Sequence, residues 1–281
     1  MTRLSEIESH IATIGELRDV VGAIRSLAGM RMQEAQRALP SIRRYAETVA
    51  ASVAAAMRLR SDDAAPSRAA AGLRRAVIVC TSEHGFVGGF NERLVSAASA
   101  ELRHDDFLFI VGTRGAALFA AAGRPGDATW AMATRLPNTT GLADRVVRTL
   151  YDHISRGEIG RVDVIHARPS AGAASVVVSR SLLPLDPASV AAQEGGEAPV
   201  HYLSAAALLE ALVGEYLFGL LAEALVESLA SENAARLSAM EAARDNVTVK
   251  LEQLHDTARR VRQSDITSEV LELIAGAEAT T

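Results

Sequence analysis

The last quarter of the chain carries a helical pattern of hydrophobic residues that continues from Ser204 to Ala279 without a proline. Strong helix formers dominate this stretch, and its apolar residues recur every seven positions, a spacing typical of a coiled coil. Asn233 and Arg244 interrupt the pattern. The main row is Val226, Asn233, Met240, Val247, Leu254 and Val261, and the second row is Ala230, Leu237, Leu251 and Ala258. After Val261 the register shifts to Ile266, Val270, Leu273 and Ala277, which indicates a change of neighbour or local unwinding.

A second long helix is predicted at the other end of the chain, over Leu4–Leu59. Its seven-residue repeat is unbroken: Ile7, Ile14, Val21, Ala28, Ala35, Ile42, Val49 and Ala56. Pro40 should kink this helix and free the carbonyl of Gln36. Residues 1–60 hold nine arginines and six acids, whereas residues 204–281 hold six bases and thirteen acids. Two stripes of opposite charge at opposite ends of the chain predict an antiparallel pair of helices.

The middle of the chain predicts alternating strands and helices. Two short apolar runs, 76–81 and 107–112, flank a helical stretch at 91–103, and this βαβ pattern implies a parallel sheet. Further helices are expected at 113–122 and 141–155, and further strands at 161–167 and 174–183 with a turn at 170–173. A polar linker at 60–75 and a loop at 184–199 separate this region from the long helices.

The predicted fold class is therefore α/β, with a long antiparallel coiled coil of N- and C-terminal helices and an inserted Rossmann-like α/β domain. The corresponding domains are residues 1–60, 74–183 and 204–279.

Composition narrows the class of protein. Of the 281 residues, 49% are hydrophobic and the mean hydropathy is +0.13, so the composition is not that of a disordered chain. A net charge of −5 gives no general attraction to nucleic acid, and a single cysteine, Cys80, excludes a disulfide framework. The N-terminus has no apolar leader, and the most apolar window, 205–226, contains Glu210, Glu215 and Glu223. We therefore expect a reducing, cytosolic setting and membrane association through partners alone.

Candidate chemistry is sparse. The run from Gly85 to Asn91 follows a strand and opens a helix, where backbone N–H groups could hold phosphate, but it matches neither common phosphate-binding motif. Gly85, Gly88 and Gly89 are better interpreted as a structural turn. The histidines lack ligand spacing, so we expect no metal site, no cofactor and no catalytic centre. A nucleotide-binding α/β protein with coiled-coil arms and a coiled-coil scaffold remain as alternatives.

Four segments resemble the gamma subunit of F-type ATP synthases, in the same order along the chain. They are AIRSLAGMRM at 23–32, the glycine-rich turn at 85–91, SENAARLSAMEAARDN at 231–246 and RQSDITSEVLELIAGA at 262–277. Arg44–Glu47 is similar to the continuation of that family's first helix. Gly22 and Glu241 stand where the family often has lysine, which leaves a divergent or second rotary ATPase open.

The resemblance implies a rotor shaft inside a ring of three alpha and three beta subunits, with an α/β domain that docks on the epsilon subunit and the c-ring. It also implies a peripheral location at the cytoplasmic face of the bacterial inner membrane, in a complex that couples ion (proton) transport to ATP synthesis or hydrolysis. By the same resemblance, Arg236 and Gln263 are expected to touch beta at two separate places, and Arg25 and Arg31 are further candidate contacts. Since Arg236 and Gln263 sit at the edge of the apolar stripe or off it, we expect both to be dispensable for folding.

Overall fold

The computed structural model describes residues 2–59, 73–170, 175–184 and 202–278. The chain divides into two compact units. The smaller unit is formed by the two ends of the chain, residues 1–27 and 237–281, and the larger unit by residues 28–236. Two long helices, α1 (Thr2–Arg58) and α6 (Ala205–Glu278), contribute to both units.

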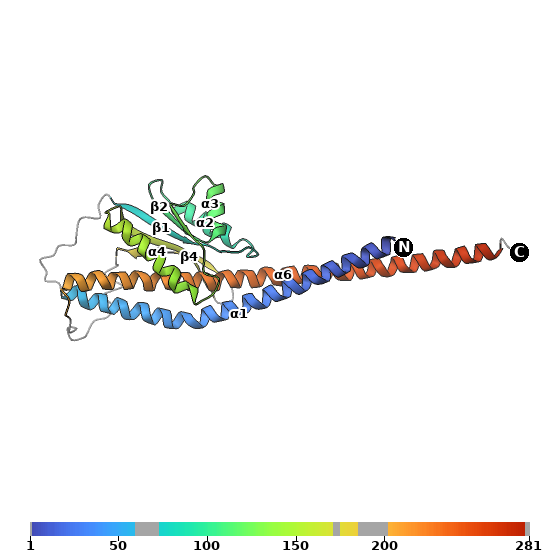
Figure 1. Cartoon of the computed structure of the whole chain (residues 1–281), viewed down its shortest axis with the longest axis horizontal. Helices are drawn as coiled ribbons and strands as arrows, with labels where there is room; N and C mark the ends of the chain where they lie inside the picture. Colours follow the sequence, from blue (N-terminus) through green and yellow to red (C-terminus); the bar gives the residue numbers. More distant parts are fainter. Residues whose placement is uncertain (1, 60–72, 171–174, 185–201, 279–281) are drawn as a thin grey trace. The chain divides into compact units, whose positions relative to one another are not determined.

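The smaller unit is an antiparallel pair of helices (Figure 1). Arg25 near the end of its α1 part pairs with Glu241 at 3.3 Å, and Glu8 near the start of α1 pairs with Arg262 at 2.7 Å. A step toward the N-terminus of α1 is thus a step toward the C-terminus of α6. The predicted antiparallel pairing is confirmed. Arg25–Glu241 has the predicted direction, with the base on α1 and the acid on α6, whereas Glu8–Arg262 has the reverse direction.

Burial follows the predicted seven-residue rows. Every residue of the unbroken row in α1 is buried or half-buried, and so is every residue of both rows in α6 up to Val261. Beyond Val261 the shifted row is not covered, since Ile266 and Val270 are exposed, while the side chains of Leu273 and Ala277 lie outside the described part. α1 runs as one helix through Pro40, whose side chain is exposed.

The larger unit contains a five-stranded sheet in the order β3-β2-β1-β4-β5. The strands are β1 (Arg74–Cys80), β2 (Phe107–Val111), β3 (Ala128–Trp130), β4 (Ile159–Arg168) and β5 (Val176–Leu183). The first four pair in parallel, as predicted, but β5 runs antiparallel to β4, so the sheet is mixed. The three-residue β3 was not predicted, because so short a strand gives no readable hydrophobic period.

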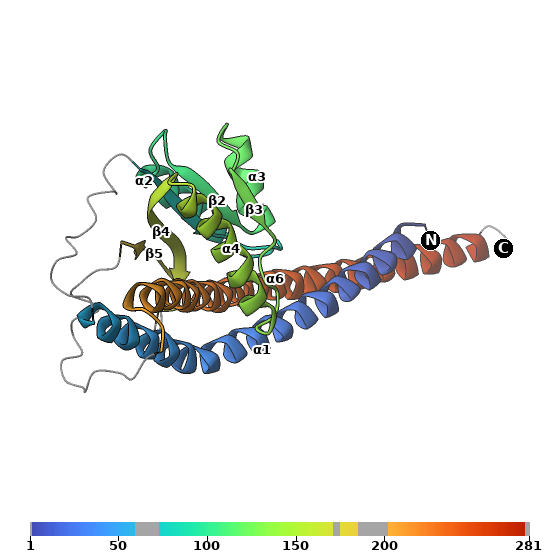
Figure 2. The same ribbon diagram turned by 60° about the vertical axis from the view of Figure 1, so that its left-hand side comes forward.

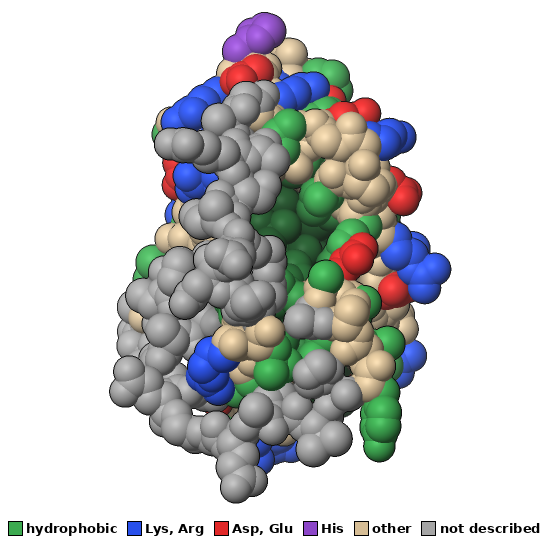
Figure 3. All heavy atoms as spheres, turned by 90° about the vertical axis from the view of Figure 1, so that its left-hand side faces the viewer, with side chains coloured by type: hydrophobic (Ala, Val, Ile, Leu, Met, Phe, Trp, Pro, Cys, Tyr) green, Lys and Arg blue, Asp and Glu red, His purple; other side chains and the backbone are tan. Residues whose placement is uncertain are grey.

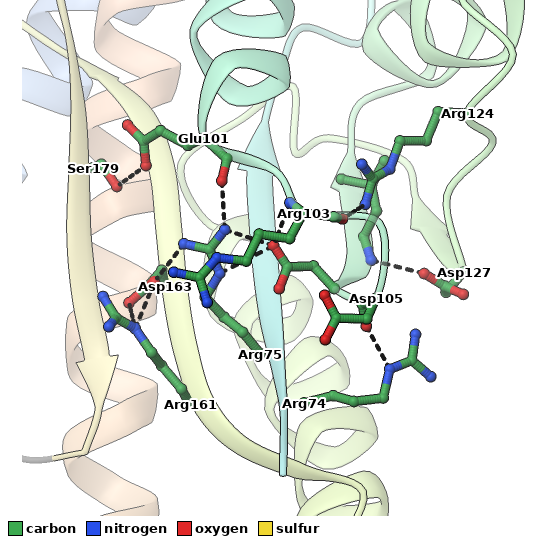
Figure 4. A network of polar contacts seen from close by, with 12 residues as sticks. Arg74, Arg75, Glu101, Arg103, Asp105, Arg124, Asp127, Arg161, Asp163 and Ser179 are labelled. Atoms are coloured by element: carbon green, nitrogen blue, oxygen red, sulfur yellow. Dashed lines mark hydrogen bonds and ion pairs between the residues drawn. The ribbon is translucent and has the colours of Figure 1, made fainter. Parts of the chain in front are cut away.

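Two residues assigned to the linker belong to the first strand instead. Arg74 lies over the ring of Phe107, with its guanidinium carbon 3.7 Å from the ring centre. Arg75 donates to Asp106 (Nε–Oδ2 3.1 Å) and to Asp163 at 3.3 Å, as Figure 4 shows. Neighbouring carboxylates and an aromatic ring thus stabilise Arg74 and Arg75 within β1. From the sequence pattern alone, this strand was predicted to begin at residue 76. The rest of the predicted linker, the loop at 185–199 and most of the turn at 170–173 lie outside the described residues.

Helices cover both faces of the sheet (Figure 2). On one face α2 (Phe90–Glu101) and α3 (Thr113–Ala121) pack against Val77 and Val79 of β1. On the other face α4 (Asn138–Ser155), α6 and α1 join Ala76 and Ile78 in one apolar cluster. Successive β1 side chains therefore enter different cores, which is why the strand reads as a continuous apolar run.

The first prediction tests the helix pairing. Val21 is 7% exposed and lies on the apolar row, whereas its neighbour Val20 is 54% exposed. Val21→Asp should lower the free energy of unfolding by about 2–4 kcal/mol, because it buries an unpaired charge between the helices. Val20→Asp is the control and should change it by roughly 0.5 kcal/mol or less. Thermal unfolding followed by circular dichroism measures both, and equal stability of the two variants would reject the pairing.

Candidate functional site

The glycine-rich turn between β1 and α2 is held by an arginine of α6. Arg236 donates from Nη2 to the carbonyl oxygen of His84 at 3.2 Å and from Nε to that of Gly85 at 3.3 Å. The same guanidinium pairs with Glu232 at 2.7 Å, and Arg236 is only 8% exposed. Sequence segments more than 140 residues apart are thereby joined at one point.

This placement corrects one expectation. Arg236 was expected at the edge of the helix stripe or off it, dispensable for folding, but it is buried. The reason is that α6 has a second neighbour besides α1: the inserted sheet and its turn cover this part of the helix. The spacing of apolar residues could not predict the contact with the glycine-rich turn. That contact is made by the polar side chain of Arg236, which is not part of the apolar pattern.

Burial raises the pKa of the Glu232 carboxyl, and the adjacent Arg236 guanidinium offsets only part of that effect. Arg31, another predicted contact residue, is half-buried and also lowers the pKa of Glu232, whereas Glu83 raises it. Arg31 and Arg236 therefore belong to one charged neighbourhood around Glu232.

The glycines of the turn differ in what they require. Gly88 has φ +55°, in the left-handed region, whereas Gly89 has φ −80° and open space where a Cβ would lie. A Cβ on Gly85 would lie 2.9 Å from the guanidinium end of Arg114. Two glycines that sequence reasoning missed are more constrained, since a Cβ on Gly112 or Gly115 would come within 2.5 Å of Thr81. The sequence did contain a signal for this close approach, since Gly112 directly follows β2 and Gly115 lies in the first turn of α3.

The remaining predicted contact residues lie in the smaller unit. Arg25 is half-buried and pairs with Glu241, and Gln263 is exposed. Arg31 and Arg236 belong to the larger unit.

A second polar site lies deeper in the larger unit. Glu223 and Glu227, one turn apart on α6, meet basic side chains from three other elements; we call these six residues the carboxylate cluster. Glu223 pairs with Arg43 of α1 at 3.0 Å and with Arg180 of β5 at 2.7 Å. Glu227 also pairs with Arg43, and it contacts Nε2 of His166 at 2.8 Å and Arg168 at 3.3 Å, both from β4. The Glu227 side chain is 2% exposed.

The surroundings of Glu227 favour its charged form. Burial by itself would raise the pKa of this carboxyl, but contacts with His166, Arg43 and Arg168 outweigh burial and lower the pKa from 4.5 to about 2. Glu227 is therefore ionised across the physiological pH range.

An apolar groove lies between α4 and the first turns of α6. Its cavity of about 440 Å³ is lined by Tyr151, Ile154, Leu209, Glu210 and Val213 among others. Figure 3 shows hydrophobic side chains gathered in a hollow on this side of the molecule. Tyr202 just before α6 is fully exposed.

A smaller cavity of about 330 Å³ lies beside the glycine-rich turn, between it and α3. Arg114, Asn91 and Glu92 line it, and the Asn91 amide is already bonded to Ser82. The cavity keeps the nucleotide-binding alternative open to test.

Reactive groups are few in the part of the chain that the structure describes. No group of three or more His, Cys, Asp or Glu side chains there is arranged to hold a metal ion. Cys80 is fully buried in β1, and burial raises the pKa of its thiol to about 12. Within the described residues, no helix is long and apolar enough to cross a membrane.

The fold is that of two long terminal helices packed together, with an inserted five-stranded α/β sheet. A family model described as ATP synthase matches residues 3–280 of the chain. The chain is 28% identical to the ATP synthase gamma chain of a Synechococcus strain and 27% identical to that of Frankia casuarinae. These alignments cover 99% of this chain and 99% and 97% of the two relatives. The chain therefore belongs to the ATP synthase gamma chain family, the family of the central stalk of the rotor.

Solved structures share the fold. A chain in the mitochondrial ATP synthase of Euglena gracilis, in a structure of OSCP, F1 and c-ring, superimposes with a TM-score of 0.66 at 14% identity. That match covers 99% of this chain and 95% of the other. A chain of the central stalk and c-ring of Tetrahymena thermophila mitochondrial ATP synthase gives a TM-score of 0.53 at 19% identity, over 80% of this chain and 99% of the other.

The second prediction distinguishes the turn glycines. Gly88→Ala should destabilise the chain by about 1–2 kcal/mol, because alanine is strained at positive φ. Gly89→Ala is the matched control and should cost roughly 0.5 kcal/mol or less. Urea unfolding of the full chain measures the difference, and a larger loss at Gly89 would contradict the described turn.

The third prediction concerns acid stability. The folded-state pKa of Glu227 lies below its ordinary 4.5, so its stabilising contribution is present above pH 4.5 and is lost as the pH falls toward 2. The upper limit of that loss is about 3 kcal/mol. Glu227→Gln should therefore flatten the fall in stability between pH 5 and pH 3. Unfolding free energies at several pH values measure the slope, and parallel curves for parent and variant would reject the cluster.

Proposed function

We propose that this chain transmits rotation between the c-ring of the membrane sector and the catalytic beta subunits of an F-type ATP synthase. Its partners in this proposal are three alpha and three beta subunits, the epsilon subunit and the c-ring. The complex lies peripherally at the cytoplasmic face of a bacterial inner membrane. The chain itself makes and breaks no bonds.

The observation that carries the proposal is one 74-residue helix, α6, that serves two units of the chain. In the smaller unit it pairs with α1, and in the larger unit the same helix is packed by the inserted sheet. A continuous helix is a suitable element for carrying a turning force from an α/β domain to a paired shaft. Membership of the gamma chain family along nearly the whole chain supports this role.

The coupling would act through differential contact. A shaft that touches one beta conformation more favourably than another shifts the population among those conformations, and with it the affinity for nucleotides. We propose that residues 1–60 and 204–279 form the shaft domain and residues 74–183 the docking domain.

The contacts with beta are proposed at exposed or half-buried polar residues. Gln263 is exposed and can both donate and accept hydrogen bonds. Arg25 and Arg31 are half-buried and carry charge. We propose that Arg236, whose guanidinium is occupied by His84 and Gly85, supports a beta contact by holding the glycine-rich turn.

The docking surface for epsilon or the c-ring is proposed at the α4–α6 groove. Leu209, Val213 and Ile154 offer apolar area there, and Tyr202 beside α6 is fully exposed. Apolar grooves with a polar rim are typical of protein interaction sites.

Co-expression of the chain with its alpha and beta subunits tests the proposal. Recovery of an assembly with ATPase activity that depends on this chain supports it. Recovery of the chain alone, with its own turnover or tight nucleotide binding abolished by changes at the glycine-rich turn, would favour the nucleotide-binding alternative.

The fourth prediction concerns Gln263. Gln263→Ala should lower the number of protons pumped per ATP hydrolysed by the reconstituted complex, because it removes a polar contact with beta. Gln253→Ala is a matched control: both glutamines are exposed on α6, and each backbone carbonyl accepts a 2.8 Å bond from the threonine four residues on. Proton uptake and ATP hydrolysis measured on the same vesicles give the ratio. Equal ratios in both variants would remove Gln263 from the contacts.

A further inference from the structure

The rotational setting of α6 comes from close packing together with polar contacts. Buried residues of the helix itself include Ala222, Ala224 and Ala230. Close packing resists displacement, but alanine and leucine surfaces provide no directional bonds. The polar contacts of α6 therefore add directional bonds to the packing.

Those polar contacts extend from Glu215, which accepts from the Tyr45 hydroxyl of α1, to Arg236, which holds the glycine-rich turn. Ser228 donates to the carbonyl oxygen of Cys80 at 3.4 Å and Ser231 to that of Ala167 at 3.0 Å, which ties the helix to β1 and β4. The carboxylate cluster lies on the adjoining part of the same stretch. Breaking an ion pair to a buried carboxylate costs more than breaking a neutral hydroxyl bond of this kind.

The cluster joins α6 to three of the elements that pack on it. Arg43 comes from α1, His166 and Arg168 from β4, and Arg180 from β5. Arg43 reaches both carboxylates, so it links the two successive turns of α6 to α1. A turn of α6 in either direction would stretch bonds to the sheet or bonds to α1.

The carboxylates of the cluster are buried, whereas its arginines reach the surface. The Glu227 side chain is 2% exposed and that of Glu223 is 11% exposed, but those of Arg43, Arg168 and Arg180 are 45%, 47% and 35% exposed. His166 is 1% exposed, and its Nδ1 has no hydrogen-bond partner in the described part of the chain. Within the described residues, the contact of its Nε2 with Glu227 is therefore the polar contact that orients this ring.

We propose that Glu227, assisted by Glu223, is a positioning residue that locks the rotational setting of α6 against α1 and the sheet, so that a turning force on the α/β domain passes into the shaft. The transmission of a turning force rests on the proposed function. The lock between α6, α1 and the sheet is a property of the chain alone.

The lock is tested by hydrogen exchange on the full chain. Glu227→Gln keeps the size of the side chain and removes the charge. It should speed exchange of backbone amides in α6 between 216 and 233 and in β4 and β5 by about tenfold or more, because local opening no longer breaks a buried ion pair. Unchanged exchange in these segments would overturn the lock.

Asp106→Asn is the matched control. The Asp106 side chain is likewise 2% exposed and likewise pairs with an arginine, Arg75 of β1, but its partners lie within the sheet and its connections. This variant should speed exchange near β1 and β2 and leave α6 at the parent rate. Equal acceleration of α6 in both variants would mean a general loss of stability and would overturn the proposal.

The transmission is tested on the reconstituted complex in vesicles. Glu227→Gln should retain ATP hydrolysis but lose ATP-driven proton uptake when an opposing gradient is applied, and Glu227→Asp should restore part of that uptake. Asp106→Asn should pump as the parent does. If Glu227→Gln pumps like the parent, the proposal is overturned; if the parent complex itself does not pump, the proposed function fails while the exchange result still decides the lock.

Discussion

The structure depends on one helix being covered from two directions. Between Tyr216 and Asn233 almost every side chain of α6 is buried, because α1 packs on one side and the inserted sheet and α4 on the other. An amphipathic helix needs a single apolar stripe, whereas a helix with two neighbours must be apolar nearly all round or carry polar groups that find partners. This stretch does both, with leucines and alanines for packing and with Glu223, Glu227 and Glu232 for polar bonds.

That double role explains where the charged residues of the larger unit lie. A buried carboxylate is costly unless cations and donors surround it, and each of these three glutamates has at least one arginine. Arg236 serves the glycine-rich turn and Glu232 together, while Arg43 serves α1 and the carboxylate cluster. The connection between the α/β domain and the helices is therefore ionic as well as apolar.

Much of the fold could be predicted because its periods are long and regular. The unbroken row from Ile7 to Ala56 specified which side of α1 is covered, and the βαβ pattern gave the parallel strands. The three-residue β3 was missed because so short a strand has no readable period. β5 was predicted as a strand, but its antiparallel pairing was not, since the pattern of its residues does not determine direction. Arg74 and Arg75 were assigned to the linker because adjacent charged residues are more typical of loops than of strands. Their partners in the fold, Phe107, Asp106 and Asp163, explain why they lie in a strand.

The candidate site was less accessible to sequence reasoning. The position of Gln263 on an exposed helix face could be predicted from the heptads. The burial of Arg236 could not, because it depends on the glycine-rich turn, about 150 residues away in the sequence. The same holds for the carboxylate cluster, whose basic members come from α1, β4 and β5. Nothing in the sequence distinguishes these glutamates of the predicted C-terminal helix, and only the fold shows that Glu223 and Glu227 share Arg43.

Direct observation of rotation tests the central claim, that this chain is a shaft which turns while the ring around it stays still. The alpha–beta–gamma assembly would be fixed to a surface through beta, and a visible probe attached at an exposed position of this chain. The account predicts continued rotation of the probe in one direction when ATP is added, and no rotation without ATP. A probe that stays still while the same immobilised complexes hydrolyse ATP would contradict it.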